Sequence, residues 1–234
     1  MRRPVCYGRF VHVATSAMFM LVLAAATPAS AQLAIFNFEG LAATYTDPPD
    51  GPRPGAITFL SQSNNGVTMD LSRTSGTGFD IVGNTGGQGG KPASWGLKSL
   101  DPFFASTTAD TFLANFNTKL FKLSLDFGDY GADSDTGSIT FYSGPNGTGS
   151  VVGTTSSFYG FSAFPTFNTM SFSSVDTFQS AKFVGGSSAF PNSVFYDNIQ
   201  VSAVPEGDSL ALLAAGLVPM SLLVSRKRKN RTAH

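Results

Sequence analysis

Short stretches in which apolar and polar residues alternate recur along most of the chain, and they limit the possible fold more than any other feature. Alternation with a period of two places every second side chain on the same face of a β-strand. Clusters such as DPPDGPRPG and GNTGGQGGKP separate the stretches and are typical of turns. The pattern predicts an all-β fold, an antiparallel β-sandwich of the jelly-roll kind, with one helix candidate at residues 107–115. The clearest strand candidates are LAIFNF (33–38), GVTMDLS (66–72), KLFKLSLDF (119–127), GSITFYS (137–143), TFNTMSFSS (166–174) and SVFYDNIQVSA (193–203).

Phenylalanine is the aromatic residue on which such a sandwich would depend. The chain has 22 Phe against 6 Tyr and 1 Trp, and many Phe stand at alternate strand positions, as Phe36 and Phe38 do. We expect this stripe to form the core rather than a ligand site. The single cysteine, Cys6, precedes the predicted strands, so packing and not a disulfide framework must stabilise the fold.

The N-terminus has the pattern of a secretory signal peptide. Three arginines accompany an apolar run at residues 10–26, and Ala29 and Ala31 then occupy the two positions that a signal peptidase reads. We therefore expect residues 1–31 to be removed by cleavage before Gln32. An uncleaved membrane anchor is the alternative.

A second apolar stretch, residues 210–224, contains no charged residue. A helix of this length would span about 22 Å, less than the ~30 Å hydrocarbon core of a bilayer, so we expect at least a transient membrane helix. The alternative is a buried helix of a soluble domain. Basic residues remain on the cytoplasmic side, which places the body of the protein across the membrane. The basic residues after the stretch are Arg226, Lys227, Arg228 and Lys229, with Arg231 close behind.

A short motif, an apolar span and a basic cluster at the C-terminus together resemble the PEP-CTERM sorting signal of Gram-negative bacteria. Val204, Pro205 and Glu206 match the Val-Pro-Glu-Pro opening of that signal, whereas Gly207 stands where its second proline is expected. The resemblance covers residues 204–234. It implies export across the inner membrane, processing by an exosortase-type membrane protease, and a place at the cell surface or in an exopolysaccharide-rich biofilm.

The body between these signals, residues 32–203, is long enough for one domain. It carries seven Lys and Arg against 13 Asp and Glu, a net charge of −6. An acidic body argues against nucleic acid as a partner. Both histidines, His12 and His234, lie in the terminal segments with Cys6, so the body can form no Ser-His-Asp triad, Cys-His dyad or His/Cys zinc site. A pair of carboxylates of the glycosidase kind remains available.

Four aspartates, Asp126, Asp129, Asp133 and Asp135, cluster between two strand candidates in LDFGDYGADSDTGS. Oxygen ligands on a glycine-punctuated loop suit a hard cation such as Ca²⁺. The spacing is not that of an EF-hand, and the same residues are common in turns, so a solvated hairpin loop is the alternative.

Two further carboxylates lie at the two ends of the body. Glu39 directly follows the first strand candidate, and Asp197 lies within the last one. First and last strands commonly pair in jelly rolls, which would bring the two side chains together. The pattern is similar to that of carbohydrate-binding-module jelly rolls, and this resemblance implies that Glu39, Asp197 and neighbouring carbonyls hold a structural Ca²⁺ ion. Local turn or edge contacts of Asp197 are the alternative.

A glycan site would need an exposed aromatic side chain, for which Trp95 and Tyr130 are the candidates. The sequence favours a non-enzymatic cell-surface or matrix protein associated with extracellular polysaccharide. A specific glycan-binding module and a carboxylate-based glycan-cleaving enzyme are the alternatives.

Overall fold

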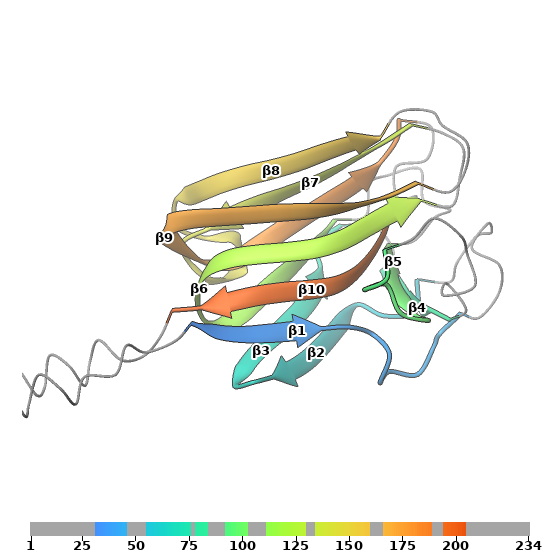
Figure 1. Ribbon diagram of the computed structural model, residues 1–234, viewed down its shortest axis with the longest axis horizontal. Helices are drawn as coiled ribbons and strands as arrows, with labels where there is room; N and C mark the ends of the chain where they lie inside the picture. Colours follow the sequence, from blue (N-terminus) through green and yellow to red (C-terminus); the bar gives the residue numbers. More distant parts are fainter. Residues whose placement is uncertain are drawn as a thin grey trace, which may run out of the picture. The chain divides into compact units, whose positions relative to one another are not determined.

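The computed structural model describes residues 31–45, 55–75, 78–83, 92–102, 111–129, 134–159, 166–188 and 194–204. They belong to one compact unit, Ala31–Val204, and their strand ladders are all antiparallel. A short 3-10 turn, Pro145–Gly147, follows β7. The strands are β1 Gln32–Phe36, β2 Phe59–Asn64, β3 Val67–Arg73, β4 Phe79–Val82, β5 Ser99–Pro102, β6 Phe112–Asp129, β7 Asp135–Tyr142, β8 Val151–Tyr159, β9 Thr166–Gly186 and β10 Phe195–Ala203 (Figure 1).

Two long strands, β6 and β9, connect the two layers of the sandwich because each belongs to both. Residues 112–116 of β6 pair with β3, whereas residues 120–128 pair with β10. β9 follows β6 through the same bend, where their register is interrupted between Asn115 and Leu120. Strands that change sheets at such a bend form the corners of a sandwich. One layer, here called the β7 layer, contains β8, β7, the second half of β9, the first half of β6, β3 and β2.

The other layer, here called the β10 layer, contains the first half of β9, the second half of β6, and β10. Beyond β10, β1 pairs with residues 199–203 and β5 with Tyr196, and β4 pairs with β5. The expected pairing of first and last strands is therefore confirmed (Figure 1). It places the turn after β1 beside the β4–β5 hairpin.

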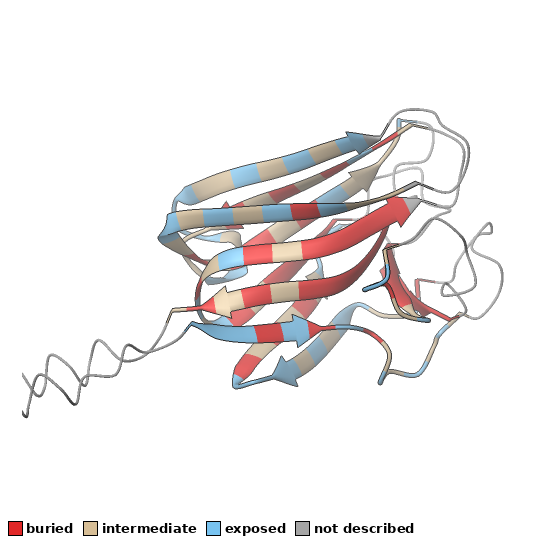
Figure 2. Cartoon of the chain, in the orientation of Figure 1, coloured by how far each residue is buried: buried red, intermediate tan, exposed pale blue. Residues whose placement is uncertain are grey.

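Phenylalanine fills the space between the layers, as the alternation predicts. Phe112 stacks on Phe183 with ring centroids 4.6 Å apart, and Tyr196 meets the Phe112 ring edge-on at 5.3 Å. Each buried ring contributes about 2–3 kcal/mol to stability. Figure 2 shows buried residues alternating with intermediate or exposed ones along several strands. The fully buried phenylalanines include Phe36, Phe38, Phe79, Phe127, Phe141, Phe178, Phe183 and Phe195.

The predicted fold class is confirmed, but the helix candidate is wrong where the structure describes it. Residues 112–115 lie in β6, paired with both β3 and β9. Phe112 and Ala114 pack into the core, and tertiary packing overrides local helix preference. No helix in the described part of the chain is long and apolar enough to cross a membrane. The predicted signal peptide, the apolar span at 210–224 and the sorting residues after Val204 lie outside the described residues.

Candidate functional site

An extra residue in β10 places two polar side chains side by side on the outer face of the β10 layer. Asp197 is the register partner of Asp126, but Gln200 is the partner of Ser124, so β10 has one residue more than β6 here. Asn198 takes up the bulge with a φ of 49°, a left-handed conformation that asparagine tolerates. The side chains of Asp197 and Asn198 consequently both lie away from the core.

Asp126 is the centre of a hydrogen-bond network on this outer face. Its Oδ1 accepts from Thr169 Oγ1 at 2.6 Å, and its Oδ2 accepts from Asn198 Nδ2 at 3.0 Å and from Ser94 Oγ at 2.5 Å. Gln200 Nε2 extends the network by donating to Asn198 Oδ1 at 3.1 Å. Both oxygens of the Asp126 carboxylate are therefore satisfied inside the protein.

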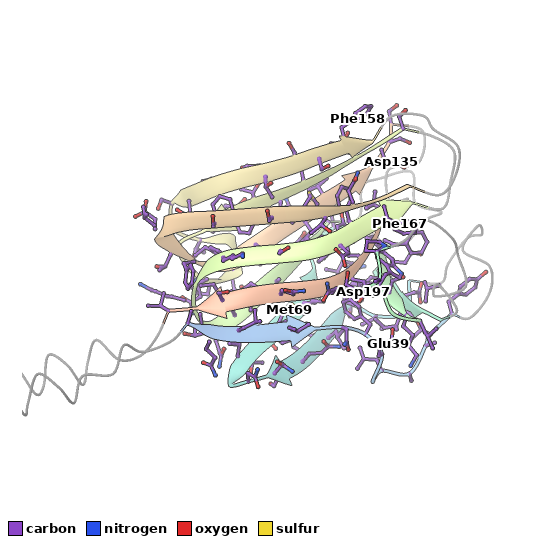
Figure 3. The ribbon with its side chains drawn as sticks, viewed as in Figure 1. Glu39, Met69, Asp135, Phe158, Phe167 and Asp197 are labelled. Carbon is purple, nitrogen blue, oxygen red and sulfur yellow. The ribbon has the colours of Figure 1, made fainter. Side chains whose placement is uncertain are left out.

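Residues 92–98, here called the strap, contact β9, β10 and the turn after β1 in that order along the sequence. Trp95 meets Phe167 of β9 edge-on with ring centroids 4.8 Å apart. The Gly96 amide donates to Asp197 Oδ2 of β10 at 3.0 Å. The Leu97 and Lys98 amides then donate to Glu39 Oε1, in the turn after β1, at 2.6 and 2.8 Å. The predicted pair Glu39 and Asp197 thus binds successive amides of one segment, at the end of the sandwich seen in Figure 3.

Lys98 contributes its side chain as well as its amide to this corner. Its Nζ donates to the backbone carbonyl oxygen of Glu39 at 2.8 Å and to that of Leu41. The ammonium group therefore links the turn after β1 to the strap by hydrogen bonds.

The pKa of Asp197 is raised to about 7, and burial is the largest cause. The amides of Gly96 and Asn198 oppose this rise, whereas the charges of Glu39 and Asp126 add to it. The Asp197 side chain is 0% exposed. Removing a carboxylate from water disfavours its charged form, and neighbouring negative charges act in the same direction. Asp197 is thus a buried acid at the junction of β10, β6 and the strap.

The geometry of this corner does not fit a Ca²⁺ ion held between Glu39 and Asp197. Ca²⁺ takes six to eight oxygen ligands. Here both Asp197 oxygens accept backbone amides, Glu39 Oε1 accepts two, and the Lys98 ammonium binds the neighbouring carbonyls. Within the described residues, no three His, Cys, Asp or Glu side chains are arranged to hold a metal ion. Calcium at this corner is therefore an untested prediction, and the contacts described here argue against it.

The structure does not bring the described members of the Asp126–Asp135 cluster together. Asp126 belongs to the network under the strap, whereas Asp135 is buried at the start of β7, on the side of Ile139 and Phe141. Burial, and then the charge of Asp135, raises the pKa of Tyr196. Asp133 and the side chain of Asp129 lie outside the described residues.

Trp95, one of the two predicted aromatic platforms, is not an exposed ring. Trp95 is only 3% exposed, because it packs against Phe167, Phe195 and Val82. The sequence pattern could not show that the strap turns this residue inward. Tyr130 lies outside the described residues.

An exposed aromatic residue that the sequence analysis missed is Phe158 in β8. It is 66% exposed and projects from the end of β8 in Figure 3. Thr154 and Ser156 share its face of the strand, and all three are exposed. The sequence gives no clear signal for this exposure, because Thr155 and Ser157 place hydroxyl groups on the other face of the strand as well.

Hydroxyl side chains form ordered rows on the outer face of β7 and β8, here called the hydroxyl face. The register pairs Thr140 with Thr154, Ser138 with Ser156, and Thr136 with Phe158. Neighbouring strands lie about 4.8 Å apart, and alternate residues along a strand about 6.7 Å apart. The next strand, β9, places Lys182 beside Thr140 and Val184 beside Ser138.

No family model and no curated protein sequence matches the chain. Several solved structures resemble it. The K2 cleaved adhesin domain of Lys-gingipain has a TM-score of 0.41 at 11% identity, covering 72% of this chain and 98% of that domain. The family 29 carbohydrate-binding module from Piromyces equi has a TM-score of 0.33 at 16% identity, covering 59% of this chain and 91% of that module. The family 11 carbohydrate-binding module from Clostridium thermocellum has a TM-score of 0.33 at 13% identity, covering 74% of this chain and 96% of that module. Its structure was solved in complex with a β-1,3-1,4-mixed-linked tetrasaccharide. Since these scores are low, we base the function on the residues of this chain.

Proposed function

We propose that the protein is an exported, non-enzymatic surface or matrix protein that associates with extracellular polysaccharide through the hydroxyl face. The observation that carries this proposal is Phe158, a ring left 66% exposed beside registered rows of threonine and serine. A ligand that covers this ring would remove its apolar surface from water, which favours binding.

The chemistry of the hydroxyl face suits a neutral polysaccharide. Each Ser or Thr hydroxyl both donates and accepts hydrogen bonds, as sugar hydroxyls do. The Phe158 ring offers an apolar surface to the C–H face of a sugar. Lys182 is the charged side chain in these rows, so the face neither requires an anionic ligand nor repels a neutral one.

Burial of the acids supports a non-enzymatic role. One pair of carboxylates on adjacent strands, Asp80 and Asp101, is 0% exposed. Another pair, Asp126 and Asp197, is 2% and 0% exposed. A glycosidase needs both carboxylates in contact with the scissile bond. Asp126 and Asp197 instead accept hydrogen bonds from the protein itself.

The terminal segments support the proposal that the protein is exported. The signal peptide pattern at residues 1–31 and the PEP-CTERM-like segment at residues 204–234 are features of the sequence. We propose that signal peptidase and an exosortase-type protease process them in a Gram-negative bacterium. The C-terminal span would hold the chain in the membrane until the second cleavage.

Affinity gel electrophoresis through neutral polysaccharides tests the binding surface. We expect the polysaccharide to retard the wild-type protein and Phe158→Ala to weaken its binding roughly tenfold, the loss of one ring contact. The matched control is Phe59→Ala, because Phe59 is 59% exposed but starts β2 at the opposite edge of the layer. Equal retardation of the wild type and Phe158→Ala would refute the assignment. A glycan array then separates a matrix protein, which shows no preference among sugars, from a specific glycan-binding module.

A further inference from the structure

The turn after β1 and the strap meet around a single cation that the chain itself supplies. Lys98 makes three hydrogen bonds there, one from its amide to Glu39 Oε1 and two from Nζ to the carbonyl oxygens of Glu39 and Leu41. Carbonyl oxygens that converge on one point are also the kind of ligand that a hard metal ion takes. In this protein an ammonium group occupies that point.

The surroundings of Lys98 are acidic. Glu39 and Asp126 both act electrostatically on Asp197, so the three carboxyl groups share one corner of the sandwich. A corner of this composition favours a nearby positive charge. Lys98 is half-buried, so solvent screens its charge less than that of a freely exposed lysine.

We propose that the Lys98 ammonium takes the place of a metal ion at this corner, so that the fold needs no Ca²⁺. The cation joins the turn after β1 to the strap, while the strap amides hold the carboxylates that a metal would otherwise hold. The inference is independent of polysaccharide binding, which we assign to a different layer of the sandwich.

Thermal unfolding of the full chain tests the proposal, measured in excess calcium chloride and in excess chelator. We expect the wild-type Tm to be the same in both. Lys98→Gln keeps a hydrogen-bond donor but removes the charge, and should lower the Tm by about 5–10 °C, the loss of two charge-assisted hydrogen bonds in a domain of this size. Lys98→Arg keeps the charge and should retain most of the wild-type Tm.

The matched control is Lys122→Gln, because Lys122 is an exposed lysine on the outer face of the same layer. Its substitution should shift the Tm by less than about 2 °C. A wild-type Tm that rises by several degrees in calcium would overturn the proposal, since a ligand of the folded state stabilises it by mass action. A Lys98→Gln protein as stable as the wild type would overturn it as well.

Discussion

Asp197 is a buried carboxyl group whose surroundings favour its neutral form. Its pKa is raised from the ordinary value of 3.8 to about 7 in the folded protein. Between these values the folded state holds a proton that the unfolded state has lost. The contribution of Asp197 to the free energy of unfolding therefore falls as the pH rises through this window, by up to about 1.4 kcal/mol per pH unit, and becomes constant above it. The charged groups that act on it are Glu39 and Asp126, and the Glu39 carboxylate accepts a hydrogen bond from the Lys98 amide.

We predict that Asp197→Asn removes this component of the pH dependence. Urea denaturation from about pH 4 to pH 8 should show a shallower fall in stability for the variant than for the wild type. Parallel pH profiles for the two proteins would contradict the assignment of a raised pKa to Asp197.

At the scale of elements, the strap depends on a close approach that only glycine permits. A Cβ atom on Gly96 would lie 2.0 Å from Glu39 Oε1, so a side chain there must displace the carboxylate that binds the Leu97 and Lys98 amides. The strap also carries Trp95 against Phe167 and Ser94 against Asp126. Moving one residue therefore disturbs contacts to several strands.

We predict that Gly96→Ala lowers the free energy of unfolding by about 2 kcal/mol or more, the loss of hydrogen bonds to a charged group. Gly40→Ala is the control, because a Cβ atom there would meet nothing within 4 Å. Chemical denaturation of the two variants against the wild type provides the comparison. A loss in Gly96→Ala no larger than that in Gly40→Ala would show that the strap is not held as described.

The parts of the fold that the sequence predicts are those in which local pattern and tertiary packing agree. The alternation of Phe36 and Phe38 with polar residues indicates β1, and its pairing with β10 follows from their places as first and last strands. The helix candidate failed because residues 112–115 lie in a strand that belongs to both layers. The pairing of the first and last strands predicts that Glu39 and Asp197 lie together, but no local pattern shows that Lys98 and the strap would join them.

At the scale of the whole molecule, the account depends on a body that leaves the cytoplasm. A net charge of −6 and a phenylalanine core without cysteine suit a protein that must stay folded outside the cell by packing alone. The hydroxyl face has a function only where extracellular polysaccharide is present. Export is therefore the central claim on which the proposed function depends.

Intact-mass analysis of the protein recovered from the cell surface and medium of its native cells tests this claim most directly. The account predicts a chain that begins at Gln32 and ends near the Val204-Pro205-Glu206 motif, because both terminal segments are removed during export and sorting. Recovery of the unprocessed chain from the cytosol, with all 234 residues present, would contradict it.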